Sequence, residues 1–394
     1  MAGRPLVAAL AIGLTAWCGC GRADSAPSRA TGPDPATPAP ADASAESTAS
    51  WPLFRADPLA SGAARGELPE KLRVLWTFAL DDGWFESTAA IVDGTVYVGS
   101  TDGNLYAVGL ADGQKKWAFA TEPGFTASPA VRDGRVYLGD SYGTFYCVDA
   151  QTGKQKWSFE TEAEINSSAN FYGKHVLFGS QDAFLYCLEA ETGRVVWKYE
   201  SGDQIRCFPT TVNDRGFVAG CDGRLHVVDL VEGKSAADVE LDGPTGSTPA
   251  VLGTRVFVGT EGGVFFAIDW KQAQVAWTYR SPERASAYRS SAAVTEEAVI
   301  VGSRDKRLRA FDPKTGDVLW TFSARGQIDS SPVIVGRRVF VGSDDGHLYA
   351  VNRKTGEEVW HYELGGSLLA SPAVAAGRLV IGTDDGDLVC FGPD

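Results

Sequence analysis

The sequence predicts an all-β fold, an eight-bladed β-propeller, and three observations support this prediction. Tryptophan recurs about every 40 residues, each repeat contains four short apolar stretches separated by turns, and the first and last repeats are incomplete in complementary ways. A period of this length is typical of stacked supersecondary units. A single such sheet cannot bury both of its faces, so its copies must pack against one another around an axis.

Tryptophan marks the end of each repeat. The seven marker residues are separated by 41, 40, 40, 80, 43 and 40 positions, so one repeat has lost its tryptophan. The gap falls near Val239, in the stretch GKSAADVEL, and counting this degenerate unit gives eight repeats. We expect the tryptophans to pack between neighbouring blades, because large aromatic side chains supply apolar contact area. They are Trp76, Trp117, Trp157, Trp197, Trp277, Trp320 and Trp360.

Each repeat has the pattern of a four-stranded meander. Residues 127–157, ASPAVRDGRVYLGDSYGTFYCVDAQTGKQKW, contain four runs rich in Val, Tyr and Phe with a turn at each junction. The first turn is Asp133-Gly134, which favours a two-residue hairpin. In the last turn an aspartate can accept N–H groups of the turn, and a glycine can adopt a left-handed conformation. We interpret these turn aspartates as structural; they are Asp149, Asp229, Asp269 and Asp312.

The two ends of the repeat region predict how the ring closes. The stretch Leu72 to Leu80, LRVLWTFAL, precedes any complete repeat, and the last repeat stops after three strands at DLVCFGPD. An unpaired strand edge favours aggregation, whereas closure of the ring removes that edge. We therefore expect residues 72–80 to form the outer strand of the last blade in a propeller that spans residues 72–394.

The segment before the repeats predicts export. Arg4 precedes the apolar stretch PLVAALAIGLTAW, which has the length of a signal peptide and is short for a transmembrane helix. Cys20, preceded by Gly19, resembles the acceptor cysteine of a lipoprotein, although Trp17 and Cys18 depart from the usual lipobox. Residues 1–20 would then be a lipoprotein leader, and the alternative is an ordinary cleaved signal peptide.

Two further segments lie between this leader and the repeats. Residues 21–50 are rich in Ala, Pro, Ser and Thr with almost no large apolar side chain, so they predict a disordered tether. Residues 51–71 begin with WPLFRADPLASG, which restores apolar side chains. We expect this lead-in segment to pack on the ring.

The net charge limits the choice of partner. The 36 Lys and Arg residues against 50 Asp and Glu residues give a net charge of −14, and removal of Arg4 with the leader leaves −15. This excess of negative charge disfavours nucleic acid or an anionic membrane surface as a ligand. Contact with a membrane is therefore expected only through the lipid anchor.

The cysteines of the repeats fall into two groups. Cys207 and Cys221 lie on facing strands of one hairpin, around Asn213-Asp214, and are the pair that could form a disulfide. The others share a third-strand position that alanine takes in other repeats, so they read as small buried side chains. These are Cys147, Cys187 and Cys390.

The sequence contains no recognisable catalytic motif. No Gly-x-Ser-x-Gly, His-Glu-x-x-His or phosphate-binding loop is present, and the Asp-Asp-Gly turns at Asp344 and Asp384 lack the alternating oxygen ligands of a calcium loop. We therefore expect no catalytic residue and no metal site. The histidines neither repeat nor pair in the sequence; they are His175, His226, His347 and His361.

The repeats do predict a binding site. In a meander the fourth-to-first and second-to-third connections emerge on one face, here called the top face. The position just before each inner strand varies between acid, amide, base and apolar residues, while its neighbours stay small, and it should surround the mouth of the central channel. Such variation on a rigid scaffold is typical of a binding surface, and the alternative is solvated loop residues. The predicted partner-binding residues are Glu86, Thr126, Asn166, Arg206, Arg289 and Asp329, and Gly246 and Leu369 complete the ring.

The mouth is expected to be acidic with a local basic contact. Arg206 and Arg289 are the basic residues at mouth positions, with Arg304, Lys306 and Arg307 nearby, which suits a local contact with an acidic peptide. The second-to-third loops on the same face are acidic. They contribute Asp102, Asp182, Asp222, Glu261, Asp344, Asp345, Asp384 and Asp385.

The repeat motif carries a family resemblance. The patterns DxxTGxxxW and GSxDGxLYA resemble the pyrroloquinoline-quinone (PQQ) type propeller repeat from about Leu72 to Asp394, and WD40 and kelch patterns do not recur. The size and the absence of added domains resemble the BamB-like lipoproteins of the outer-membrane β-barrel assembly machinery. Quinoprotein alcohol dehydrogenases share the motif but are longer and use adjacent cysteines, calcium ligands and a catalytic Asp. No adjacent cysteine pair is present in this chain.

This resemblance implies an exported scaffold. We expect a lipid-anchored propeller on the periplasmic side of the outer membrane that binds envelope proteins or peptides, as a monomeric ring within a complex and without a cofactor. Without the anchor it would be periplasmic or extracellular. One alternative is a PQQ-dependent oxidoreductase with calcium, and another is a binding module for a small envelope ligand such as a glycan.

Overall fold

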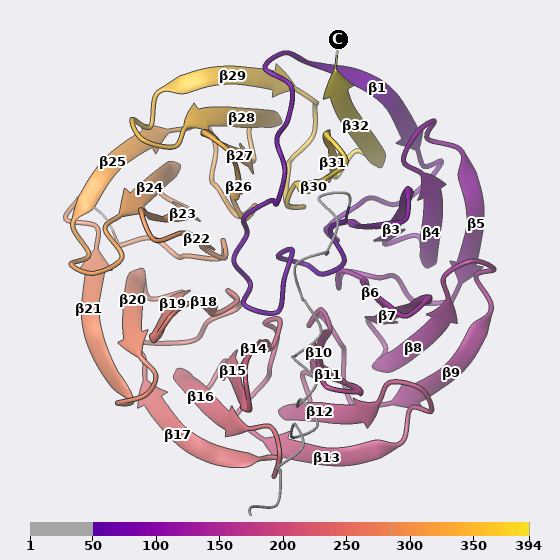
Figure 1. Ribbon diagram of the computed structural model, residues 1–394, viewed down its shortest axis with the longest axis horizontal. Coiled ribbons are helices and arrows are strands. Elements are labelled where there is room, and N and C mark those ends of the chain that lie inside the picture. Colours follow the sequence, from indigo (N-terminus) through magenta and orange to yellow (C-terminus); the bar gives the residue numbers. More distant parts are fainter. Residues whose placement is uncertain (1–49, 284, 394) are drawn as a thin grey trace, which may run out of the picture. The chain divides into compact units, whose positions relative to one another are not determined.

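The computed structural model describes residues 50–283 and 285–393, which form strands and turns. They build eight antiparallel sheets of four strands each, arranged as blades around a common centre (Figure 1). The predicted eight-bladed β-propeller is confirmed. No helix within these described residues is long and apolar enough to cross a membrane. The predicted leader and tether lie outside the described residues.

Each blade is a meander that runs from the channel to the rim. Blades 1 to 4 consist of β2 (Ala90–Val92), β3 (Thr95–Gly99), β4 (Asn104–Gly109) and β5 (Lys115–Ala120); β6 (Ala130–Arg132), β7 (Arg135–Gly139), β8 (Thr144–Asp149) and β9 (Gln155–Glu160); β10 (Asn170–Tyr172), β11 (His175–Gly179), β12 (Phe184–Glu189) and β13 (Val195–Glu200); and β14 (Thr210–Val212), β15 (Arg215–Ala219), β16 (Arg224–Asp229) and β17 (Lys234–Glu240).

Blades 5 to 8 repeat this arrangement. They consist of β18 (Ala250–Leu252), β19 (Arg255–Gly259), β20 (Val264–Asp269) and β21 (Gln274–Arg280); β22 (Ala293–Val294), β23 (Val299–Ser303), β24 (Arg307–Phe311) and β25 (Val318–Ser323); β26 (Val333–Val335), β27 (Arg338–Gly342), β28 (His347–Asn352) and β29 (Glu358–Glu363); and β30 (Ala373–Ala375), β31 (Arg378–Gly382), β32 (Asp387–Pro393) and β1 (Leu72–Ala79). The inner three strands of each blade are largely buried, whereas the outer strand is largely exposed.

The ring closes as the sequence predicted. Strand β1 pairs antiparallel with β32, from Leu72 opposite Pro393 to Ala79 opposite Asp387, and completes blade 8 (Figure 1). The Trp76 side chain is 9% exposed and donates from Nε1 to the carbonyl oxygen of Leu110 in blade 1 at 2.9 Å. The first strand in the sequence therefore joins the last blade to the first one.

The repeat tryptophans explain the glycine of the DxxTG turn. Each of six tryptophan rings packs on the turn glycine of the next blade, where an added Cβ would lie 2.6 to 2.8 Å from the nearest ring atom. All six glycines also have a positive φ, near +70° to +80°. The turn thus needs glycine for its conformation and for the tryptophan contact. The pairs are Trp76–Gly113, Trp117–Gly153, Trp157–Gly193, Trp197–Gly233, Trp277–Gly316 and Trp320–Gly356.

Blade 4 lacks the marker tryptophan, and a tryptophan of blade 5 packs at the interface between these two blades. Ala237 stands on β17 near the expected marker position, and the turn glycine of blade 5 is replaced by Ala273 at φ +50°. Trp270, from the same blade 5 turn, packs edge-on against Phe217 of blade 4 with ring centroids 5.5 Å apart. Ala237, Trp270 and Ala273 all pack on one apolar cluster. An aromatic ring therefore still fills this interface, but the next blade supplies it.

The lead-in segment runs through the centre of the ring, in indigo in Figure 1. Its carbonyl oxygens accept backbone N–H groups from the inner strands of six blades, at 2.8 to 2.9 Å. In blade 3 the Asn170 side chain donates to Pro58 instead, at 3.1 Å. The segment therefore contacts the inner strands of seven blades. The backbone pairs are Ile91–Trp51, Val131–Pro52, Thr211–Pro58, Val251–Leu59, Val294–Ser61 and Ile334–Gly62.

Arg55 fixes the lead-in segment within the channel. Its side chain is fully buried and donates from Nη2 to the carbonyl oxygens of Pro332 at 2.6 Å and Ala292 at 3.3 Å. Burial lowers the pKa of this guanidinium to about 9, and the nearby Asp57 carboxylate opposes the shift. A side chain held in this way belongs to the packing of the ring rather than to a surface.

Candidate functional site

A ring of hydroxyl groups lines the channel just below the mouth. In seven of the eight blades a Ser or Thr at the same repeat position accepts a hydrogen bond from the backbone N–H of the equivalent residue in the preceding blade, at 2.9 to 3.2 Å. The bond from Ser371 to Thr88 joins blade 8 to blade 1. We call this set the hydroxyl ring; it comprises Thr88, Ser128, Ser168, Thr248, Ser291, Ser331 and Ser371.

The hydroxyl ring has one gap, between blades 3 and 4. Phe208 takes the eighth position and offers no hydroxyl, so the N–H of Ser168 lacks the bond that the other members make. Phe208 instead packs against Phe54 of the lead-in segment, with ring centroids 6.3 Å apart. The gap therefore coincides with an apolar contact below the mouth.

All eight predicted mouth positions surround one hollow of about 180 Å³. The hydroxyl ring forms its wall, and Phe54 and Phe208 also line it. Because the lead-in segment occupies the channel beyond Phe54, the hollow is a shallow cup. The mouth residues are Glu86, Thr126, Asn166, Arg206, Gly246, Arg289, Asp329 and Leu369.

One side of the mouth, formed by blades 2 to 4, carries a chain of amide contacts. The Asn166 amide donates to the Thr126 hydroxyl at 2.8 Å and accepts a short hydrogen bond from Gln181. The Arg206 guanidinium donates to the side-chain amide oxygen of Gln204 at 2.7 and 3.1 Å and to that of Gln181 at 3.3 Å. Among the described residues no carboxylate pairs with Arg206. We call this set, residues Thr126, Asn166, Gln181, Gln204 and Arg206, the amide arc.

The other side of the mouth is ion-paired. Arg289 Nε lies 2.8 Å from Glu261 Oε1, and the Arg304 guanidinium holds the largely buried Asp329 at 2.5 to 3.1 Å. The Asp329 carboxylate raises the pKa of Arg304. The basic residues grouped together from the sequence are therefore not equivalent, since Arg289 and Arg304 already have carboxylate partners. Likewise Arg307 pairs with Glu283, and Lys306 donates to the Arg325 carbonyl oxygen at 2.9 Å.

Cys207 and Cys221, the pair considered for a disulfide, are free thiols in the structure. The Cys207 sulfur accepts the N–H of Ala219 at 3.3 Å, in the way that the Ser167 hydroxyl accepts the N–H of Gly179 in blade 3. It therefore points at the backbone of the second strand rather than at the turn that carries Cys221. Burial raises the pKa of the Cys207 thiol to about 12 and keeps it protonated.

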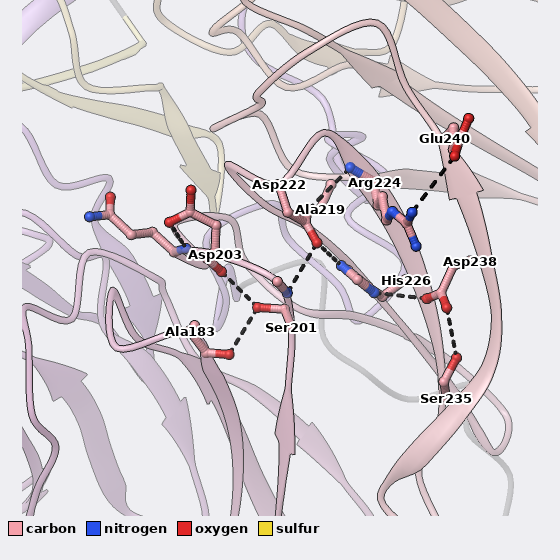
Figure 2. Close-up of polar contacts among 12 residues, drawn as sticks. Ala183, Ser201, Asp203, Ala219, Asp222, Arg224, His226, Ser235, Asp238 and Glu240 are labelled. Atoms are coloured by element: carbon pink, nitrogen blue, oxygen red, sulfur yellow. Dashed lines mark hydrogen bonds and ion pairs between the residues drawn. The ribbon is translucent and has the colours of Figure 1, made fainter.

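His226, which has no apparent partner in the sequence, lies between two carboxylates (Figure 2). Its Nε2 is 2.8 Å from Asp222 Oδ2 and its Nδ1 is 2.8 Å from Asp238 Oδ1. Asp222 also accepts the N–H of Gly202 at 3.1 Å, which joins blade 4 to the loop after blade 3. We interpret the cluster as a structural link.

The signal for this cluster was present in the other repeats. Four blades place a tyrosine at the His226 position, and its hydroxyl donates to the aspartate of the preceding turn. Comparing DGRLH in blade 4 with the matching stretches would have paired His226 with Asp222. The tyrosine pairs are Tyr106–Asp102, Tyr146–Asp140, Tyr186–Asp182 and Tyr349–Asp345.

The family follows from a comparison with models of known protein families. The model described as outer membrane protein assembly factor BamB matches residues 70–206, 181–327 and 304–392, which together span the propeller. The chain belongs to this BamB family. A search of curated protein sequences found no match.

Solved structures agree with the BamB-family fold. BamB from Moraxella catarrhalis aligns with a TM-score of 0.71 and 21% identity, over 82% of this chain and 98% of that chain. The quinohemoprotein alcohol dehydrogenase from Comamonas testosteroni aligns with a TM-score of 0.77 and 15% identity, over 89% and 82%. A computationally designed protein, Ika8, aligns with a TM-score of 0.70 and 16% identity, over 80% of this chain and 98% of that chain. At these identities the likeness establishes the fold of this BamB-family chain and leaves its activity to its own side chains.

The top face of this BamB-family propeller offers no cluster with metal-binding geometry. Among residues 50–283 and 285–393, no group of three or more His, Cys, Asp and Glu side chains has that arrangement. Several acidic residues of the top loops have structural partners: Asp102, Asp182 and Asp345 accept tyrosine hydroxyls, and Asp222 contacts His226. The cup at the mouth, with its amide arc, therefore remains the best candidate for a functional site.

Proposed function

We propose that this protein is a cell-envelope scaffold that binds protein or peptide partners at the mouth of its propeller. The observation that carries the proposal is that eight residues from eight blades, which vary where the scaffold does not, surround one shallow cup. Rigid frameworks that present variable loops are common binding surfaces. The family model is described as an outer membrane protein assembly factor, and we extend that role to this chain.

The envelope location is part of the same proposal. It rests on family membership and on the leader, which lies outside the described residues. We propose that Cys20 carries a lipid anchor on the periplasmic side of the outer membrane. Cys20→Ser should then move the protein from the detergent-rich to the aqueous phase in detergent phase separation, because buried acyl chains provide the attachment. Equal partitioning of the two proteins would contradict lipidation.

The second candidate function is a PQQ-dependent oxidoreductase, favoured by the fold shared with the Comamonas alcohol dehydrogenase. The residues of the cup fit PQQ poorly. Its volume of about 180 Å³ is below the 300 to 1,000 Å³ that is usual for cofactor pockets. PQQ carries three carboxylates, yet Arg289 and Arg304 are already paired with Glu261 and Asp329. We therefore place the scaffold function first.

A photocrosslinking experiment tests the scaffold function. A photoreactive phenylalanine replaces Leu369, which is 36% exposed at the mouth, or Val231, which is 64% exposed in a turn on the opposite face. We expect the Leu369 variant to capture a protein partner in intact envelopes and the Val231 variant to capture none. Arg206→Glu together with Arg289→Glu should weaken this capture while the melting temperature stays nearly unchanged, because both side chains are exposed.

Two outcomes would overturn this assignment. One is equal capture by the two crosslinker positions, which would place the partner elsewhere. The other is micromolar binding of PQQ with calcium by calorimetry, followed by dye reduction with alcohols or sugars, which would favour the oxidoreductase.

A further inference from the structure

We propose that the amide arc is a carboxylate-binding subsite, which holds one carboxylate of an extended peptide segment through the Arg206 guanidinium. This inference rests on the proposed function and names the chemistry that the mouth recognises. The carboxylate can belong to a chain end or to an Asp or Glu side chain, and both present the same pair of oxygens to an arginine.

Arg206 differs from the other basic residues near the mouth in its partners. Arg289 forms an ion pair with Glu261, and Arg304 forms one with Asp329. Arg206 instead donates hydrogen bonds only to the neutral side-chain amides of Gln204 and Gln181. These amides hold the guanidinium in place without compensating its charge. A guanidinium that is already ordered loses little further freedom when a carboxylate binds.

The neighbours of Arg206 admit an anion. Thr126, Asn166 and Gly246 carry no charge, and they occupy the mouth positions of blades 2, 3 and 5. The Gln181 amide, which contacts both Asn166 and Arg206, also donates to the Glu164 carboxylate at 2.7 Å, and so lies between that carboxylate and Arg206. At the mouth positions of blades 2 to 5, Arg206 is thus the one charged side chain.

The wall below Arg206 is unusual in the same sector. The gap in the hydroxyl ring leaves the N–H of Ser168 without the hydroxyl acceptor that the other blades provide, and Ser168 lines the cup. Phe208 and Phe54 supply apolar contact there. A carboxylate at Arg206 would therefore have apolar surface nearby for the carbon chain that bears it.

The size of the cup restricts how much of a partner can enter. A volume of about 180 Å³ corresponds to about six water molecules at roughly 30 Å³ each, which is room for about one residue. The rest of the peptide must lie across the rim, where Leu369 and Trp84 are 36% and 42% exposed. The acidic top loops disfavour a second negative charge on the peptide. The chemistry therefore matches a segment with a single carboxylate rather than a polyacidic one.

The test uses three acetylated peptides of equal length and otherwise uncharged sequence. One has a free α-carboxylate, one is amidated and neutral, and one is amidated with a single internal aspartate. Binding to the full propeller is measured by calorimetry or NMR titration for the wild type, Arg206→Gln and Arg337→Gln. Arg337→Gln is the matched control, because Arg337 is an exposed arginine in the turn between β26 and β27 and does not line the cup.

We expect at least one carboxylate peptide to bind the wild type and Arg337→Gln alike, and to lose about tenfold or more in affinity for Arg206→Gln. The neutral peptide should bind none of them measurably, and the arm that binds identifies a chain end or a side chain as the source. Equal binding of the neutral peptide, or no loss with Arg206→Gln, would overturn the inference. Crosslinking at Leu369 could still capture a partner after either result. The carboxylate subsite can therefore be wrong while partner binding at the mouth is right.

Discussion

A chain from which Leu72 to Leu80 has been deleted is expected to lose its cooperative unfolding transition and to aggregate. The deletion removes β1, leaves β32 as an unpaired edge and takes away the Trp76 side chain that joins blade 8 to blade 1. An exposed strand edge is a template for pairing with other chains. Differential scanning calorimetry and size-exclusion chromatography would measure both effects.

The matched control for this deletion is Trp76→Ala in the full chain. This variant keeps the β1–β32 pairing but loses a buried aromatic ring, so we expect a cooperative transition that is destabilised by about 3 to 5 kcal/mol. A deletion variant that stays monomeric with an unchanged melting temperature would show that β1 does not close the ring.

Removal of residues 51–66 of the lead-in segment is expected to lower the free energy of unfolding by about 5 kcal/mol or more. A chain that starts at Glu67 loses the buried Trp51 and Leu53 side chains and the carbonyl acceptors of six inner strands, while β1 remains. Removing a buried Trp alone typically costs about 3 to 5 kcal/mol, and each lost hydrogen bond adds about 1. Denaturant titration measures the difference.

The control for this prediction is a chain that starts at Ser50, which keeps every described contact of the lead-in segment. It should unfold at the same denaturant concentration as the full chain. If the chain from Glu67 matched it, the lead-in segment would be an accessory rather than part of the core.

The repeat pattern predicted the blades of the propeller because particular residue types mark where each blade turns and ends. A tryptophan at the end of seven blades and a glycine in most of the turns identified the blades, and the two incomplete ends predicted the pairing of β1 with β32. The mouth positions could be found in the same way. They are variable positions within an otherwise regular pattern, and the structure brings all eight of them to one cup.

The remaining features depend on contacts that leave no such pattern. The lead-in segment is held mainly by its backbone carbonyl groups, which every sequence possesses. Trp270 replaces a missing tryptophan from the neighbouring blade, so alignment of the repeats shows a loss at Ala237 and no compensation. The partner of Arg289 lies 28 residues away in another loop, and only the folded ring brings the two together.

The path of the lead-in segment also determines how the propeller would respond to mechanical load. A pull applied at Ser50 acts first on the bridge between Trp51 and Ile91, then on the bonds to Val131 and the later blades in turn. The segment would therefore peel away one contact at a time. At roughly 3.3 to 3.6 Å per extended residue, residues 51–71 release about 70 Å of chain before tension reaches β1. The strand that closes the ring is thus shielded from the N-terminal side by a length of chain that yields first.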